Sequence, residues 1–257
     1  MAIDPALAAA LHLHLYERGE LAHLAEHDTA VQASTLSALM DGKFDGDLSV
    51  AELLEHGDLG IGTFNALDGE MIVLDGVCMR ADVNGDVAQV AGATKTPFAV
   101  IAPFSAKVSG HVELDFQALL ARLDAELPAG AASAAIRIDG KFTDLKLRSV
   151  PRQHEPYPTL AEAAAQQQVF ELSHESGTVL GFRFPDQSNS LEVPGYHLHF
   201  VDDDRKRGGH VLSIGAISGE FHLDPLERLH VELPPGVNPN SENSEIDSDA
   251  VRRIESS

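Results

Sequence analysis

The chain has a single cysteine, few cations and no long apolar run, and each shortage excludes a class of protein. Among its 257 residues, 18 Lys and Arg stand against 40 Asp and Glu, which gives a formal net charge of −22. Such a charge repels nucleic acid and anionic membranes, so we expect neither as a partner. One cysteine cannot form an intrachain disulfide or a thiolate metal cage. We expect Cys78 to be a buried residue of a strand at 77–79.

Signals for membrane insertion and export are also missing. No run of 18 apolar residues occurs, which argues against a transmembrane helix. The N-terminal apolar stretch lacks a basic region before it and has Asp4 close to its start. His12, His14 and Glu17 interrupt the stretch, which is unlike a signal peptide. We therefore expect a cytoplasmic protein, long enough to bury the core of one large domain or two small ones.

The order of the periodic segments predicts an α+β fold of two related halves, with mixed or antiparallel sheets flanked by helices. Leu7, Leu11 and Leu15 recur at helical spacing and predict an N-terminal helix over residues 5–27. From Pro234 the composition becomes polar and acidic, which is typical of a disordered tail. The predicted divisions are a helical extension, a first half, a second half and an acidic tail, at residues 1–33, 34–130, 131–233 and 234–257.

Local signals place short elements within the two halves. Capping boxes, in which a Ser or Thr is followed three residues later by Glu, predict helix starts at Ser49 and Thr159. Residues 115–127 form a further expected helix, which ends at Pro128. Asp-Gly and Asn-Gly pairs are strong signals for hairpin turns between strands. They occur at residues 68–69, 75–76, 84–85 and 139–140.

The first of these turns predicts a strand pairing that places two polar side chains on the same face of a sheet. A two-residue turn at 68–69 pairs Leu67 with Glu70 and Thr63 with Leu74. Thr63 and Glu70 then share one face of the sheet. A carboxylate on such a largely apolar face is costly without a partner, and a metal or a substrate hydroxyl is a candidate partner. The alternative is an edge strand that leaves Glu70 in water.

Three histidines fall within the stretch GYHLHFVDDDRKRGGH, residues 195–210. Residues two apart in a strand share a face, so His197 and His199 project together, about 7 Å apart at Cα. A hairpin with an even-numbered loop puts His210 opposite one of them and on the same face. Three imidazoles on one face can hold a metal with an open coordination position. Spacing alone does not choose among Zn²⁺, Cu²⁺, Ni²⁺, Fe²⁺ and Mn²⁺, and three unrelated histidines are the alternative.

Three cations gather in the second predicted hairpin of this acidic chain. They are Lys146, Arg148 and Arg152. Because a guanidinium binds a carboxylate through two parallel hydrogen bonds, one of them is a candidate for binding an acidic substrate. Cations scattered over the surface are the alternative.

Several longer stretches resemble one enzyme family, in the right order over residues 34–225. They are STLSALMDGKFDGDLSVAELLEHGDLGIGTFNALDGEMIVLDG, KTPFAVIAPF, LRSVPRQHEPYPTL, GTVLGFRFP and VPGYHLHFVDDDRKRGGHVL. Together they are similar to the alpha-acetolactate decarboxylase family. The resemblance implies a homodimer that converts (S)-2-acetolactate to (R)-acetoin and CO₂ with Zn²⁺ and no organic cofactor.

The resemblance also implies roles for individual residues. The metal ligands correspond to His197, His199 and His210. The remaining active-site positions correspond to Glu70, Thr63, Arg148 and, from the C-terminal tail, Glu255. The ending DAVRRIESS carries this last match, and Glu245 is the alternative for it.

The implied chemistry suits the substrate, which has a carboxylate, a tertiary hydroxyl and an adjacent ketone. A Lewis-acidic ion can accept the charge that develops when CO₂ leaves as an enediolate forms. Arg148 would orient the carboxylate or stabilise the enediolate, while Glu70 and Glu255 would handle protons. Two other hypotheses fit the histidines: a cupin-like iron oxygenase or isomerase, and a non-catalytic protein that binds a metal or small ligand.

Overall fold

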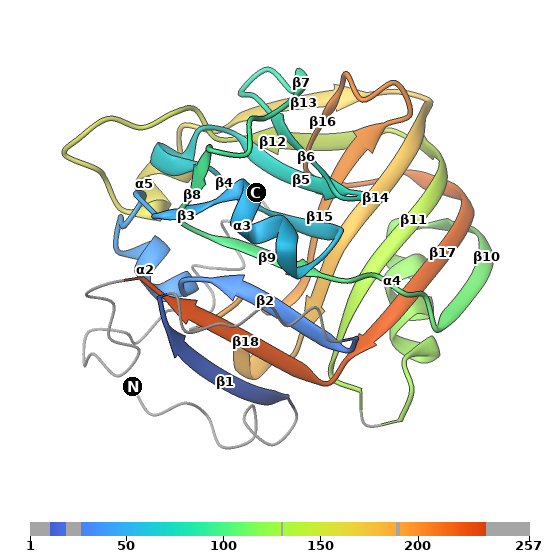
Figure 1. Cartoon of the computed structure of the whole chain (residues 1–257). Helices are drawn as coiled ribbons and strands as arrows, with labels where there is room; N and C mark the ends of the chain where they lie inside the picture. The colour runs from blue at the N-terminus through green and yellow to red at the C-terminus, as the bar shows by residue number, and fades with distance from the viewer. Residues whose placement is uncertain (1–10, 19–26, 130, 189–190, 235–257) are drawn as a thin grey trace.

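The computed structural model describes residues 11–18, 27–129, 131–188 and 191–234 of the chain. Two eight-stranded sheets supply most of the regular secondary structure, and the helices are few and short (Figure 1). The fold is therefore mostly β, with less helix than the predicted α+β class implies. No helix among the described residues combines the length and the apolar character that crossing a bilayer requires.

The first sheet combines strands from both ends of the described chain. Its outer strand β1 and its neighbour β18 run parallel, as do β18 and β2, and the remaining pairs are antiparallel. In spatial order the strands are β1 (His12–Glu17), β18 (Arg228–Leu233), β2 (Thr29–Ala33), β9 (Ala99–Ala102), β4 (Leu59–Thr63), β5 (Glu70–Leu74), β6 (Val77–Ala81) and β7 (Val87–Gln89).

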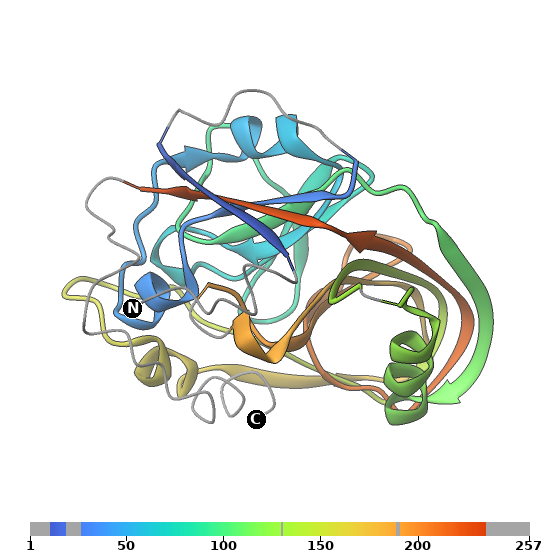
Figure 2. The same cartoon turned by 90° about the horizontal axis from the view of Figure 1, so that it is seen from below.

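The second sheet is antiparallel throughout and strongly curved. Figure 2 shows helix α4 (Phe116–Glu126) on its concave side. In spatial order the strands are β10 (Val108–Asp115), β17 (Ala216–Leu226), β11 (Ser133–Thr143), β14 (Glu175–Phe184), β15 (Gly195–Asp202), β16 (Gly208–Ser213), β12 (Leu145–Ser149) and β13 (Gln168–Leu172).

Short elements complete the described fold. The two predicted capping boxes are confirmed at the starts of α3 and α5, where Ser49 and Thr159 accept from the backbone of a Glu three residues on. The helices besides α4 are α2 (Leu36–Met40), α3 (Val50–Leu53) and α5 (Leu160–Ala164), with single 3₁₀ turns η1 (Leu54–His56), η2 (Asn65–Leu67) and η3 (Asp186–Ser188). Strands β3 (Leu48–Ser49) and β8 (Lys95–Thr96) form a separate pair.

Two apolar cores explain the arrangement of the sheets. Ile72 of the first sheet and Phe182 of the second belong to a core that lies between the sheets. Leu198 belongs to a different core, on the concave side, which includes Leu119 of α4. Alternate residues of β15 therefore face different cores, as expected for a strand buried on both faces. Cys78 is only 2% exposed, which confirms its prediction as a buried strand residue.

The predicted N-terminal helix is wrong where the structure describes it. Residues 12–17 form strand β1, which pairs with β18 from the other end of the described chain. Leu11, Leu13 and Leu15 alternate with polar residues and pack on the core between the sheets. This period of two fits a strand, and pairing with β18 outweighs the helical propensity of the Ala- and Leu-rich composition. Residues 1–10 and 19–26 lie outside the described residues.

The predicted turn at Asp139 and Gly140 is also wrong. Both residues lie inside the long strand β11, which pairs with β14 and β17 and not with β12. Gly140 stands opposite Gly177 and Gly219 on the two neighbouring strands. A Cβ at this position would lie 2.6 Å from the carbonyl oxygen of Ser218, so the glycine serves close backbone approach in a curved sheet.

The proposed division into halves at residues 130 and 131 stays a prediction. The sheets do not follow this boundary in the sequence. Strand β10 precedes the boundary but belongs to the second sheet, and β18 follows the boundary but belongs to the first sheet. The chain thus crosses between the sheets more than once.

Candidate active site

Three histidines meet on the face of the second sheet that is turned toward the first. His197 and His199 are two residues apart on β15, and His210 of β16 stands directly opposite His199. This confirms the register predicted from strand parity. The ring centroids are 5.0 to 5.4 Å apart, and one ring nitrogen from each histidine lies within 4.8 Å of the others. All three residues are buried.

The position of His199 is fixed by a contact with the other sheet. Its Nδ1 donates a hydrogen bond of 2.8 Å to the carbonyl oxygen of Met71 on β5, which leaves the lone pair on Nε2. That nitrogen is buried and has no hydrogen-bond partner among the described residues. Complete burial, and then the nearby charge of His197, lower the pKa of His199 well below its ordinary value. A neutral imidazole with a free lone pair is what a metal ligand requires.

The residues therefore fit a single divalent ion. Three imidazole nitrogens at mutual distances below 4.8 Å can reach one centre. The unsatisfied Nε2 of His199 is costly in the interior unless such a partner is present. A set of three protein ligands also leaves coordination positions open for a substrate.

Beside the histidines, the two sheets contribute a buried carboxylate and guanidinium. Arg148 on β12 donates a hydrogen bond from Nη1 to Oε1 of Glu70 on β5, at 3.3 Å. The other carboxylate oxygen of Glu70 lies 3.6 Å from Nε2 of His199. Glu70 is 7% exposed on a strand with neighbours on both sides, so the alternative of an exposed edge strand is wrong. Arg148 stands opposite His210 in the second sheet.

The predicted register of the first hairpin is wrong in detail. Thr63 pairs with Glu70 and not with Leu74, because Asn65–Leu67 form the 3₁₀ turn η2 and leave the strand. Direct pairing still places Thr63 and Glu70 on one face of the sheet. The hydroxyl of Thr63 donates to the carbonyl oxygen of Gly69 at 2.8 Å. Thr63 also lines the pocket described below, and its hydroxyl oxygen keeps lone pairs with which it can accept a hydrogen bond.

The other two candidate cations do not join this group. Arg152 is 57% exposed at its side chain and pairs with Asp68 at 3.2 Å. Lys146 stands on β12 opposite Glu171 of β13, near the edge of the sheet. Among the three, Arg148 is the buried one.

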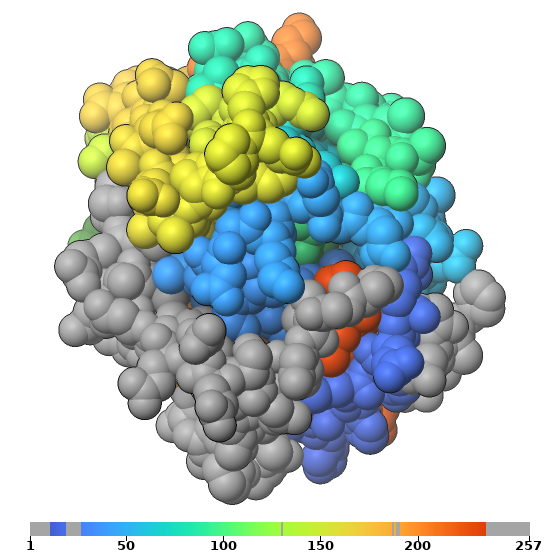
Figure 3. Space-filling view, turned by 90° about the vertical axis from the view of Figure 1, so that its left-hand side faces the viewer, coloured from blue at the N-terminus to red at the C-terminus, as the bar shows by residue number. Residues whose placement is uncertain are grey.

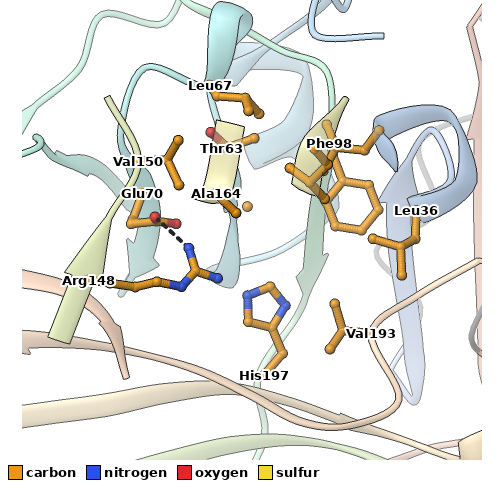
Figure 4. Close-up of a pocket in the computed structure, with 13 residues that line it drawn as sticks. Leu36, Thr63, Leu67, Glu70, Phe98, Arg148, Val150, Ala164, Val193 and His197 are labelled. Atoms are coloured by element: carbon orange, nitrogen blue, oxygen red, sulfur yellow. Dashed lines mark hydrogen bonds and ion pairs between the residues drawn. The ribbon is translucent and has the colours of Figure 1, made fainter. Parts of the chain in front are cut away.

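A pocket opens above these polar groups. Figure 4 shows Arg148 and Glu70 on one side of it, with His197 below them. Gly62 and Thr63 also line the pocket. The remaining lining is apolar and comes from Leu36, Leu39, Leu67, Phe98, Val150, Leu160, Ala164 and Val193. Helices α2 and α5 are in contact and close this end of the molecule, where Figure 3 shows their segments side by side.

Comparisons with known proteins cover most of the chain. The family model described as alpha-acetolactate decarboxylase matches residues 31–246. The alpha-acetolactate decarboxylase of Methylococcus capsulatus is 40% identical over 238 residues, which cover 91% of each chain. That of Methanosarcina mazei is 43% identical over 80% of this chain and 73% of its own.

This chain belongs to the alpha-acetolactate decarboxylase family. A crystal structure of the alpha-acetolactate decarboxylase from Bacillus subtilis strain 168 superposes with a TM-score of 0.83 at 31% identity, covering 89% of this chain and all of the other. The resemblance noted in the sequence is thus confirmed, and it extends over both sheets.

The sequence did not predict the apolar lining of the pocket, and the structure does not describe the C-terminal glutamates. The apolar residues that line the pocket come from segments far apart in the sequence. No local sequence pattern marks them as neighbours. Glu255 and its alternative Glu245 lie outside the described residues. Their role at the site stays a prediction.

Proposed function

We propose that the chain converts (S)-2-acetolactate to (R)-acetoin and CO₂, with Zn²⁺ held by His197, His199 and His210 on the face of the second sheet. One observation carries this proposal: His197, a member of the three-histidine group, borders the same pocket as the Arg148–Glu70 pair. When bound, the ion would act as a Lewis acid toward the substrate's hydroxyl and ketone oxygens. It would thereby accept the negative charge that remains on the substrate after CO₂ leaves.

Arg148 would bind the substrate's carboxylate. It lies in a buried site, where a charged hydrogen bond is stronger than in water. Its contact with Glu70 holds the guanidinium in place before the substrate arrives. As CO₂ leaves, the same guanidinium would stabilise the negative charge that remains on the enediolate oxygens.

Glu70 would move the proton of the tertiary hydroxyl. Its two oxygens face Arg148 and His199, so the carboxylate is directed toward the reacting centre. Thr63 would accept a hydrogen bond from the substrate, since its own proton is given to Gly69. Glu255 would complete the set from the tail.

The apolar wall would bind the two methyl groups of the substrate and exclude water. Leu36, Phe98 and Val193 lie across the pocket from the polar groups (Figure 4). A wall on one side and charges on the other present only one prochiral face of the enediolate to a proton donor. This supports a stereospecific product.

One anaerobic assay tests the proposal. Racemic acetolactate is added to the protein with Zn²⁺ or with a chelator, and acetoin and CO₂ are measured. We expect zinc-dependent formation of both products from half of the substrate. No acetoin with zinc would overturn the proposal. Turnover that begins only when Fe²⁺ and air are then admitted would favour the oxygenase alternative. Metal binding without turnover would favour a binding protein.

Location and assembly complete the proposal. We take the enzyme to be cytoplasmic and homodimeric, which rests on the composition and on the family resemblance. Light scattering on the purified chain would measure the mass, and a monomer would contradict this part alone.

A further inference from the structure

A buried carboxylate lies outside the residues that the proposed function uses. Glu192, in the segment before β15, is 1% exposed. Its Oε1 accepts a hydrogen bond of 3.0 Å from the backbone N–H of Val193. Burying a carboxylate is costly, so its position in the interior calls for a favourable charge or dipole nearby.

The fold fixes where this carboxylate lies. The backbone N–H of Glu192 donates to the carbonyl oxygen of Ser188 at 2.9 Å. The carbonyl oxygen of Leu191 accepts from the backbone N–H of Leu36 and from Nε2 of Gln32. The segment is thus tied to α2 and β2 through Leu191, and the backbone of Glu192 is itself held by Ser188.

Glu192 faces one edge of a histidine of the site. Its Oε1 lies 3.9 Å from Nδ1 of His197. Figure 4 shows that one ring nitrogen of His197 faces Arg148 and the other faces Val193, the residue after Glu192. The carboxylate therefore approaches the side of the imidazole that is turned away from Arg148.

A negative charge at this place selects a tautomer. It favours the form of His197 with its proton on Nδ1, which leaves the lone pair of Nε2 directed into the site. The carbonyl oxygen of Met71 has the same effect on His199. Carboxylates and carbonyls behind metal-bound histidines commonly serve in this way.

We propose that Glu192 is a positioning residue, which orients His197 and holds its tautomer for metal binding. The inference rests on the proposed function, because it requires the three histidines to hold Zn²⁺. It adds to that function a residue that the resemblance does not imply. In this role Glu192 would act through His197 and not through direct contact with the substrate or the ion.

Zinc affinity of the Glu192→Gln chain tests the proposal. Glutamine keeps the size of the side chain and an oxygen for Val193, and it removes the charge. Competition with a chromophoric chelator measures the dissociation constant for Zn²⁺ on the full chain. We expect binding about 10- to 100-fold weaker than in the parent protein. Unchanged affinity would overturn the proposal.

A matched control separates positioning from general destabilisation. Asp224 is likewise 1% exposed and accepts a backbone hydrogen bond, from Ser105 at 2.8 Å, but it stands on β17. Asp224→Asn should keep the parent zinc affinity. If both variants lower the melting temperature of the metal-free protein and weaken zinc binding equally, Glu192 is only structural and the proposal is wrong.

A double substitution tests the route through His197. His197→Ala leaves only weak zinc binding by two histidines, which titration at high zinc concentration measures, and adding Glu192→Gln should weaken it no further. A second loss of similar size would overturn the proposal. Failure of the proposed function has a different signature, since the parent protein itself would then bind no Zn²⁺ or release no acetoin.

Discussion

The carboxylate of Glu70 and the guanidinium of Arg148 meet at 3.3 Å although they stand on different sheets. Both side chains are less than 10% exposed. A second contact, from His199 of β15 to the backbone of Met71, ties the same strand β5 to the second sheet. The site thus forms only where the two sheets pack together, and its geometry depends on the core between them.

Replacing Glu70 by Gln should separate catalysis from metal binding. Glutamine cannot take the hydroxyl proton, so we expect kcat to fall by about 10²- to 10⁴-fold. Zinc content should stay at one ion per chain, because the three histidines remain. Glu232→Gln is the control: Glu232 is also a buried glutamate paired with an arginine, Arg18, at 3.0 Å. Full activity in the Glu70 variant would remove this residue from the mechanism.

His199→Ala should abolish tight zinc binding. The variant loses a ligand whose Nε2 is buried among the other two histidines, and only two imidazoles remain. Metal analysis after dialysis should find no zinc, and acetoin formation should be lost. His222→Ala is the control, because His222 is a partly exposed histidine of β17, hydrogen-bonded to Ser109. Stoichiometric zinc in the His199 variant would contradict the ligand assignment.

Strand parity was sufficient to predict the three-histidine face. The side-chain period of a strand is two, so only the loop length of one hairpin had to be right for His199 and His210 to stand opposite each other. The burial of Glu70 was also predictable, since an acidic residue in an apolar strand is unusual and points to a partner.

Long-range pairing was not predictable from local pattern. The segment at 12–17 forms a strand because its backbone pairs with β18, which lies more than 200 residues away in the sequence. Gly140 carries a local turn signal, yet glycines on both neighbouring strands keep it inside a curved sheet. In each case local propensity is only weak evidence for the secondary structure, and packing against distant segments determines which structure forms.

Removing the tail before Ser248 should reduce turnover sharply. The resemblance places Glu255 at the active site, and the truncated chain lacks this carboxylate. We expect kcat to fall by at least about 10²-fold while zinc remains bound by the histidines. Glu255→Gln should reproduce the loss in the full chain, and Glu245→Gln should not. A truncated enzyme with full turnover would support the prediction of a disordered tail without a catalytic role.

Acid should weaken the contact that ties α3 to the N-terminal strand. Hydrogen bonds from the side chain and backbone of Ser49, and then the guanidinium of Arg18, lower the pKa of Glu52 from 4.5 to about 2. A carboxylate whose pKa is lower in the folded state stabilises the fold above the unfolded pKa, and this contribution is lost as the pH falls toward the folded pKa. The Glu52 side chain is 47% exposed, so solvent screening keeps the effect small. Urea unfolding of the parent and of Glu52→Gln should therefore differ most above pH 4.5, and the difference should shrink between pH 4.5 and 2. A difference that does not change with pH would show that the ionised carboxylate contributes nothing through Ser49 or Arg18.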